Sequence, residues 1–249
     1  MLNKSDLSEN ISVIILAAGF GMRLKNDKPK SLIDLEGGKT ILDHDVDKLS
    51  KFVPIDNILV VVGYKKELVM EQHPELTFVY NEAYNRTNTG KSLLKALRKV
   101  RSGDVLWLNG DVVFDKKLIA KIITKAKTAK KSCILVDDKR CGEEEIKYTV
   151  NKNGEIVLIS KEVENPRGEA LGINLVLEKD IPILINHLEL IEDSAYFEKA
   201  IENMIGQDGT KFIPVDTHRL FCNEVDFPED LEVVKDHLKI SSAEIAVPR

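Results

Sequence analysis

The chain has 249 residues, of which 43% are hydrophobic and 31% charged, and its formal net charge is −5. This composition is typical of an ordinary globular protein with enough chain for one large α/β domain, and the acidic balance argues against a general nucleic-acid binder. Three widely spaced cysteines match neither a disulfide framework nor a zinc site, and no segment has the 18 apolar residues of a membrane span, so we expect a cytoplasmic protein.

Short apolar runs alternate with segments of helical periodicity through the first half of the chain. The helical segments lie near residues 41–49, 93–100 and 118–126. Alternation of this kind implies parallel strands joined by right-handed helical crossovers. The predicted strands are 11–17, 57–63, 77–80, 104–109 and 132–136.

After residue 137 the pattern changes. Residues 147–160 are typical of a hairpin that turns at Asn153-Gly154. The remaining predicted elements are a strand at 170–177, helices at 179–190 and 194–206, a strand at 220–225 and a closing helix at 228–239. No stretch has the composition of a linker between domains, so we treat residues 1–249 as one domain.

The most informative stretch follows the first predicted strand. Small residues end this strand, and Gly19, Gly21 and Arg23 come next. The glycines let backbone N–H groups approach a phosphate, and Arg23 adds a cation. A glycine turn after a strand also occurs in any doubly wound fold, but this one lacks the third Rossmann glycine, because Leu24 stands there. The Thr89–Ser92 stretch imitates a Walker A loop, but Asn85 replaces its first glycine.

Together with Lys28-Pro29-Lys30, this pattern resembles the signature of the nucleotidyltransferases that make sugar nucleotides and CDP-alcohols. The resemblance implies an α/β fold: a three-layer, Rossmann-like, mixed but mostly parallel sheet with helices on both faces and a small acceptor-binding β/α elaboration. It implies that Lys30 reaches the α-phosphate of an NTP and Arg23 the β- and γ-phosphates. The loop that would hold the triphosphate consists of Leu16, Ala17, Ala18, Gly19 and Gly21.

The resemblance also divides the single domain by role. Residues 1–136 are its nucleotide-binding half, 137–219 the acceptor-binding elaboration, and 220–249 the metal-binding strand end with the closing helix.

Two aspartates follow predicted strands. Asp111 comes after Asn109-Gly110, and Asp226 precedes Pro228. Either could be a helix N-cap or a turn residue, but carboxylates at strand ends also lie where open α/β sheets bind ligands. By the resemblance, Asp111 and Asp226 hold one Mg²⁺ together and Gly110 contacts the nucleotide. Magnesium needs few carboxylates, because phosphate and water oxygens complete its octahedron.

Residues 85–92 open a predicted helix with several amide and hydroxyl groups. One of them suffices for a helix cap. The segment resembles the Asn-Thr-x-x-Ser element by which CTP-using members of this family read cytosine. On that basis Asn88, Thr89 and Ser92 are candidate base-reading residues.

Residues 159–173 match the Ile-x-Lys and Gly-Glu-x-x-Gly-Ile pattern of the small-alcohol cytidylyltransferases. By that resemblance Lys161 pairs with the phosphate of the acceptor during catalysis, although a lysine after a strand is ordinarily just exposed. Glu169 would face a hydroxyl or an amine of the acceptor, or buttress the loop. The acidic run 142–145 is typical of a solvated surface.

The sequence therefore predicts an Mg²⁺-dependent cytidylyltransferase. It would transfer CMP from CTP to a small phosphorylated or phosphonate acceptor and release pyrophosphate, in a pathway for cell-surface precursors. The alternatives are a sugar-1-phosphate nucleotidylyltransferase that uses UTP or dTTP and a catalytically silent relative that only binds nucleotide. No nucleic acid or membrane is expected as a partner, and the resemblance makes a homodimer a candidate assembly.

Overall fold

The computed structural model describes residues 10–21, 24, 27–139 and 141–246. Its strands are β1 (Ile11–Ala17), β2 (Ile58–Val62), β3 (Thr77–Tyr80), β4 (Asp104–Asn109), β5 (Val112–Phe114), β6 (Ser132–Asp137), β7 (Lys147–Val150), β8 (Ile156–Ser160), β9 (Gly168–Val176), β10 (Phe212–Asp216) and β11 (Cys222–Glu224). Its α-helices are α2 (Ile41–Leu49), α3 (Lys66–Gln72), α4 (Thr89–Leu97), α5 (Lys117–Ala129), α6 (Ile181–Leu190), α7 (Phe197–Gln207) and α8 (Pro228–Ala246).

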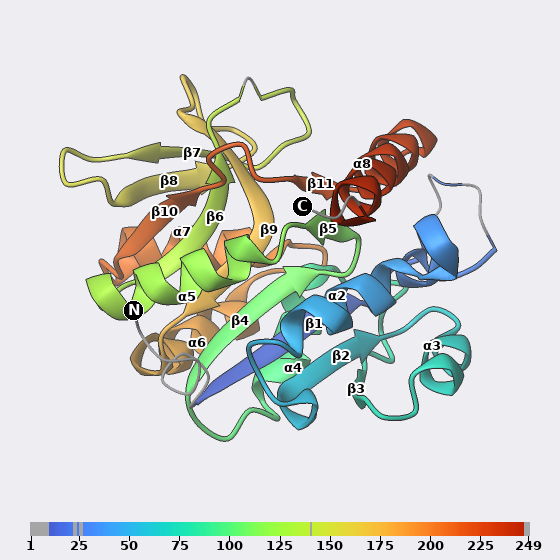
Figure 1. Cartoon of the computed structure of the whole chain (residues 1–249). Coiled ribbons are helices and arrows are strands. Elements are labelled where there is room, and N and C mark those ends of the chain that lie inside the picture. Colours follow the sequence, from blue (N-terminus) through green and yellow to red (C-terminus); the bar gives the residue numbers. More distant parts are fainter. Residues whose placement is uncertain (1–9, 22–23, 25–26, 140, 247–249) are drawn as a thin grey trace.

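A mixed sheet forms the centre of the molecule (Figure 1). Its strands follow the order β10-β6-β9-β4-β1-β2-β3, and β7 and β8 are attached beside β9. Strand β1 pairs in parallel with β2 and β4, whereas β9 runs antiparallel to both β4 and β6. The central strands are buried on both faces, which is why they are nearly continuous runs of Val, Ile and Leu. The prediction of a mixed, mostly parallel sheet is confirmed.

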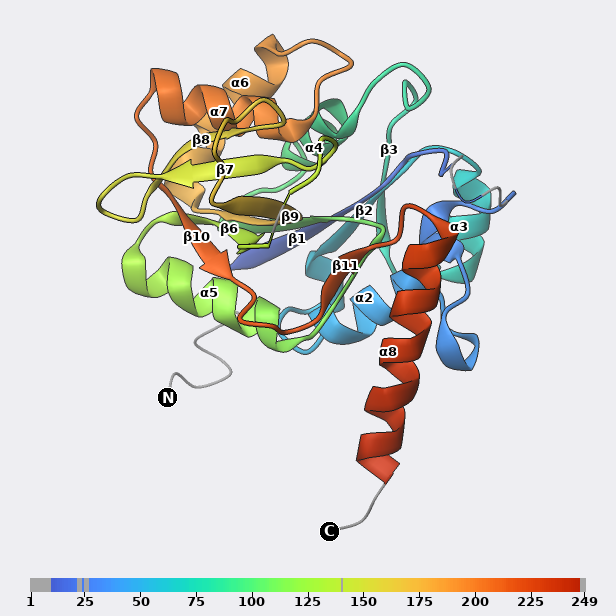
Figure 2. The ribbon, with the colours of Figure 1, turned by 90° about the horizontal axis from the view of Figure 1, so that it is seen from above.

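Helices cover both faces of the sheet, which makes three layers (Figure 2). Helices α2, α3 and α5 pack on one face and share one buried hydrophobic cluster. Helices α4, α6 and α7 pack on the other face and share a second cluster. Local signals set the helix ends. Thr40, for example, begins α2 with a capping box, in which its side chain accepts a hydrogen bond from the Asp43 N–H.

Some elements differ from the sequence-based expectations. Helix α3 and strands β5 and β10 were not predicted, and α8 runs seven residues beyond the expected end at 239. Strand β10 contains Pro214, which is tolerated because β10 lies at one end of the strand order. Within 137–219, β9 and β10 are members of the main sheet, so this stretch shares the core of the protein.

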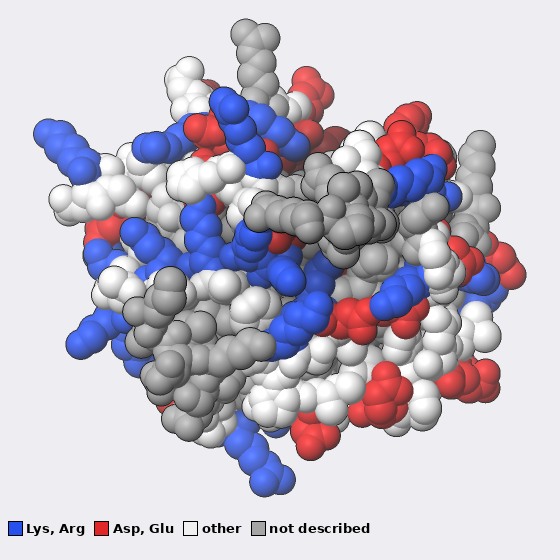
Figure 3. All heavy atoms as spheres, viewed as in Figure 1, with Lys and Arg blue, Asp and Glu red and all other residues white. Residues whose placement is uncertain are grey.

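In the described part of the chain, no helix combines the length and the apolar character needed to cross a bilayer. Although the chain is acidic overall, Lys and Arg side chains gather over the side of the molecule that carries α5 (Figure 3). The lysines within α5 are Lys117, Lys121, Lys125 and Lys127.

Candidate active site

The candidate site begins where β1 and β4 end side by side. Leu16 is paired with Asn109, and the Gly110 N–H donates to the Leu16 carbonyl oxygen at 2.9 Å. A Cβ at position 110 would lie 2.9 Å from that oxygen, so only glycine lets the two strand ends lie this close. Asp111 follows directly, at the carboxyl edge of the sheet, where open α/β folds bind their ligands.

A small second sheet brings Asp226 to the same place. Strand β11 pairs antiparallel with β5, and the Val225 N–H donates to the Asp111 carbonyl oxygen at 2.9 Å. Asp230 accepts hydrogen bonds from the N–H groups of Asp226 and Phe227 at 3.0 and 2.8 Å and so caps the start of α8. Two aspartates far apart in the sequence thus lie at one site.

Lys30 joins the two carboxylates. Its Nζ lies 2.7 Å from Asp111 Oδ2 and also donates to Asp226 Oδ1. Burial alone would lower the pKa of the Lys30 ammonium, but the two carboxylates outweigh burial and raise it. Gly21 packs against this side chain, since a Cβ there would lie 3.2 Å from Lys30 Cβ. Arg23, the other predicted phosphate ligand, lies outside the described residues.

The residues at this point fit a magnesium ion. Asp111 Oδ1 is buried and has no hydrogen-bond partner among the described residues, and both aspartates offer hard oxygen ligands to one position. No group of three or more Asp, Glu, His or Cys side chains converges within the described ranges, so a bound ion would draw its other ligands from phosphate and water.

The loop after β1 changes from buried to exposed at Gly19. Leu16, Ala17 and Ala18 are buried in the core, and Gly19 is the first exposed residue that follows them. Sequence reasoning missed an aromatic group beside this loop. The ring centroid of Phe20 lies 5.2 Å from those of both Tyr64 and Tyr84. The sequence did contain a signal for this group, because each of the three aromatic residues follows the carboxyl end of a predicted strand within a few positions.

The predicted base-reading side chains make contacts within the protein. Asn88 caps α4, where its Oδ1 accepts from the Thr89 N–H at 2.8 Å and its Nδ2 donates to the Ser194 carbonyl oxygen. Thr89 Oγ1 accepts from the Phe197 N–H. Ser92 Oγ accepts at 3.0 Å from the buried Asn81. These side chains therefore hold the shape of the 81–92 loop and join it to the start of α7.

A cavity of about 410 Å³ adjoins the carboxylates, with Asn109 and Asp226 in its wall. It also contains Lys161 and Glu169, the two residues predicted for the acceptor. Lys161 Nζ pairs with Glu144 Oε2 at 2.9 Å, and Lys139 pairs with Glu169 Oε1 at 2.8 Å. Part of the acidic run 142–145 therefore borders this cavity as well as solvent.

Two glutamates of this cavity were not singled out from the sequence. Burial raises the pKa of Glu198 to about 7. Burial, followed by the charges of Asp111 and Asp226, raises the pKa of Glu224 to about 8. Glu224 accepts from Asn109 Nδ2 at 3.5 Å, beside Gly172, whose φ is +65°. In the sequence, both residues look like ordinary surface glutamates.

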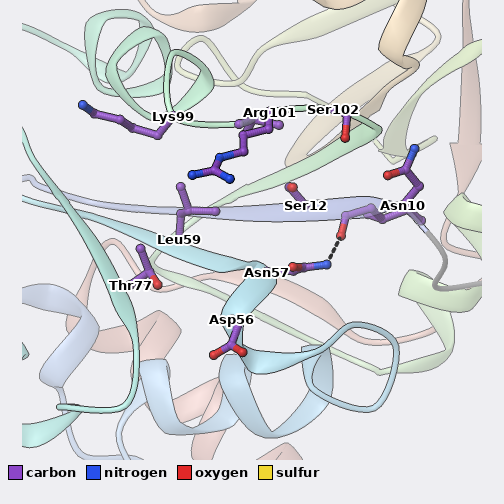
Figure 4. A pocket seen from close by; sticks show the side chains of 11 residues that line it. Asn10, Ser12, Asp56, Asn57, Leu59, Thr77, Lys99, Arg101 and Ser102 are labelled. Carbon is purple, nitrogen blue, oxygen red and sulfur yellow. Dashed lines mark hydrogen bonds between the residues drawn. The ribbon is translucent and has the colours of Figure 1, made fainter.

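A second cavity, of about 430 Å³, lies at the opposite end of β1, where Asn10 and Ser12 begin the strand (Figure 4). Asn57 donates there to the Ile11 carbonyl oxygen at 3.3 Å. Lys99 and Arg101 lie on its other side. This cavity is a strand's length away from Lys30 and the aspartates and does not contribute to their site.

Solved structures show the same fold. The CTP:phosphocholine cytidylyltransferase of Streptococcus pneumoniae has a TM-score of 0.72 at 16% identity, with 92% of this chain and 100% of that chain covered. The inositol-1-phosphate CTP transferase of T. maritima has a TM-score of 0.75 at 20% identity, with 96% and 98% covered. A UDP-glucose pyrophosphorylase has a TM-score of 0.76 at 12% identity, with 94% and 100% covered.

Sequence similarity gives the family. The bifunctional protein GlmU of Francisella tularensis subsp. novicida is 43% identical over 104 residues, which are 41% of this chain and 22% of that protein. The match thus spans about a fifth of the length of this curated relative. The family model of the MobA-like NTP transferase domain matches residues 13–186, well over half of the chain. With Lys30 and two carboxylates at the carboxyl edge of its sheet, the chain belongs to the MobA-like NTP transferase domain family.

Proposed function

We propose that this protein is a cytidylyltransferase. It transfers CMP from CTP to a small phosphorylated or phosphonate acceptor, releases pyrophosphate and forms a CDP-alcohol or CMP-phosphonate product. The observation that carries the proposal is the meeting of Lys30, Asp111 and Asp226 beside a cavity large enough for a small acceptor. We further propose that residues 1–249 act as one domain in the cytoplasm, where the three free cysteines would stay reduced.

The reaction needs positioning and charge more than proton transfer. An oxygen of the acceptor's phosphate attacks the α-phosphorus in line; the new P–O bond forms as the bond to pyrophosphate breaks, and the leaving oxygen keeps the electron pair. Negative charge accumulates on the α-phosphate as this happens. The Lys30 ammonium, held in its charged form by two carboxylates, is suited to stabilise that charge.

Asp111 and Asp226 are the proposed ligands of Mg²⁺. When bound, this ion neutralises phosphate charge and favours the more charged transition state. The protein keeps both carboxylates at one point. It does so through the pairing of β5 with β11 and through the hydrogen bond from the Val225 N–H to the Asp111 carbonyl oxygen. Gly110 and the backbone of Gly19 and Gly21 would then accommodate the phosphates.

The choice of CTP rests on the 85–92 pattern. Because the Asn88, Thr89 and Ser92 side chains bond within the protein, we propose that they act as positioning residues that hold the loop against the base. Phe20, beside the glycine loop, adds an apolar surface for the nucleoside. Lys161 is the proposed partner of the acceptor's phosphate, with Glu169 near the rest of the acceptor.

Pyrophosphate release tests this function. CTP, UTP, dTTP and ATP would be crossed with glucose 1-phosphate and with phosphates of small alcohols and amines, in the presence of Mg²⁺. Turnover with CTP and a small acceptor, lost in Asp111→Asn and Asp226→Asn, supports the proposal. Turnover with UTP or dTTP and glucose 1-phosphate would contradict it and favour a sugar-1-phosphate enzyme. Nucleotide binding without turnover on any acceptor would favour a silent relative.

A further inference from the structure

Acidic side chains dominate the cavity beside Asp226. Seven carboxylic acids and two lysines are among the residues that line it. An anionic ligand would be repelled from the acidic part of such a wall, and a cationic ligand would be attracted to it.

Two of these acids are buried and incompletely paired. Glu198 is 8% exposed and Glu169 is 5% exposed. The Oε2 atom of each has no hydrogen-bond partner among the described residues. Lys139 pairs with Glu169 through Oε1 alone, and no Lys or Arg in the described ranges forms an ion pair with Glu198. Burying a carboxylate oxygen without a partner is costly, so these atoms are suited to receive a donor from a ligand.

An aromatic ring stands on the same wall. Tyr196 directly precedes α7, the helix that carries Glu198 near its start. The ammonium of Lys161 lies 5.3 Å from the centroid of the Tyr196 ring, within the range of a cation–π contact. This part of the wall therefore already holds one cation against an aromatic face.

We propose that the acceptor is zwitterionic: besides its phosphate or phosphonate it carries an amine or quaternary ammonium, which Glu198 and Glu169 bind within the cavity, with Tyr196 beside it. This inference rests on the proposed nucleotidyl transfer. A polyol phosphate could donate hydroxyl hydrogen bonds to the two glutamates, but it would bring no positive charge. A protonated amine compensates the charge and donates to the unpaired oxygens, whereas a quaternary ammonium has no N–H and compensates the charge alone.

A binding experiment that needs no turnover tests the inference. Thermal unfolding with Mg²⁺ would be followed with choline phosphate, with 2-aminoethyl phosphate and with 3,3-dimethylbutyl phosphate, a neutral isostere of choline phosphate. We expect each cationic phosphate to bind at least about tenfold more tightly than the isostere, the scale of a desolvated contact of a cation with carboxylates and an aromatic ring. Equal binding of choline phosphate and its isostere, or no binding of the cationic phosphates, would overturn the proposal.

Matched variants locate the effect. Glu198→Gln keeps the shape of the side chain and removes its charge, so we expect the lost Coulombic attraction to weaken binding of choline phosphate about tenfold and binding of the isostere less than about twofold. Glu202→Gln is the control, since Glu202 lies on the same helix, pairs with Lys199 and does not line the cavity. A loss of equal size for both probes, or in the control as well, would contradict the assignment of Glu198.

Turnover separates this inference from the function on which it rests. If CTP reacts with inositol phosphate or glycerol phosphate as fast as with choline phosphate, nucleotidyl transfer stands and the zwitterionic acceptor is wrong. If the cationic phosphates bind selectively through Glu198 and no nucleotide is transferred, the cavity assignment stands and the proposed function fails.

Discussion

Lys30 Nζ lies 2.7 Å from Asp111 Oδ2, although 81 positions separate the two residues in the sequence. The same ammonium donates to Asp226, so one lysine pairs with both proposed metal ligands. A divalent cation bound as proposed would have the same partners as the lysine, and the first two predictions follow from this competition for two carboxylates.

Lys30→Ala should lower kcat by about two to four orders of magnitude, the cost of removing one group that stabilises transition-state charge. Lys28→Ala is the control. Lys28 is exposed and pairs with Asp34, so we expect a change of less than about threefold, as for other exposed ion pairs. Steady-state pyrophosphate release measures both variants. A loss of less than tenfold for Lys30→Ala would mean that another group supplies the charge.

Lys30→Met should increase the affinity for Mg²⁺ in the absence of nucleotide. In the wild-type protein an ion has to compete with an ammonium for Asp111 and Asp226, and the variant removes that competitor while keeping most of the side-chain volume. We expect the Kd for Mg²⁺ to fall about tenfold, as when one charged hydrogen bond no longer has to be broken. Isothermal titration tests this, and an unchanged Kd would argue that the ion does not use these two carboxylates.

Gly172→Ala should destabilise the protein and lower its activity. A Cβ at this position would lie 2.8 Å from both Asn109 Nδ2 and Glu224 Oε1, on a backbone with φ of +65°. We expect a loss of about 2–4 kcal/mol from overpacking and backbone strain together. Gly209→Ala has the same φ with nothing within 4 Å, so it isolates the conformational cost of about 1–2 kcal/mol. Equal urea midpoints for the two variants would refute the close contact.

Because Glu198 is buried, the free energy of unfolding should fall as pH rises. Burial raises its pKa from 4.5 to about 7, so between these values the folded protein keeps a proton that the unfolded chain has released. This difference in bound protons lowers the free energy of unfolding with rising pH, by up to about 3 kcal/mol above pH 7. Glu198→Gln should therefore be more stable than wild type at pH 8.5 and similar to it at pH 4.5.

Urea unfolding at these two pH values measures the effect. Glu202→Gln, at a half-buried position on the same helix, should show the same difference from wild type at both pH values. If the gain from Glu198→Gln does not depend on pH, Glu198 is not a buried titrating group. Removing the buried charge with Glu198→Gln should therefore stabilise the folded protein and, at the same time, weaken its binding of an ammonium group.

Much of the fold followed from local patterns. The apolar runs of β1, β2 and β4 and the periodicity of α2, α4 and α5 depend on neighbouring residues alone, so their positions were predicted to within a few residues. The elements that were missed carry weak local signals. Strand β5 has three residues, and Pro214 argues against a strand in β10.

The sequence by itself determined the residue types of the site: the glycine loop after the first strand, Lys30 beyond it, and Asp111 and Asp226 after later strands. Only the tertiary structure decided that Lys30 bridges the two aspartates, because that contact depends on the pairing of the short strands β5 and β11, which has no periodicity to reveal it. Only the structure placed Glu198 and Glu169 in the wall of one cavity. Only the structure also revealed that the side chains of Asn88 and Ser92 form hydrogen bonds within the protein. Burial and pairing are properties of the folded surroundings, and the same carboxylate is a solvated surface group or a costly buried charge according to what packs around it.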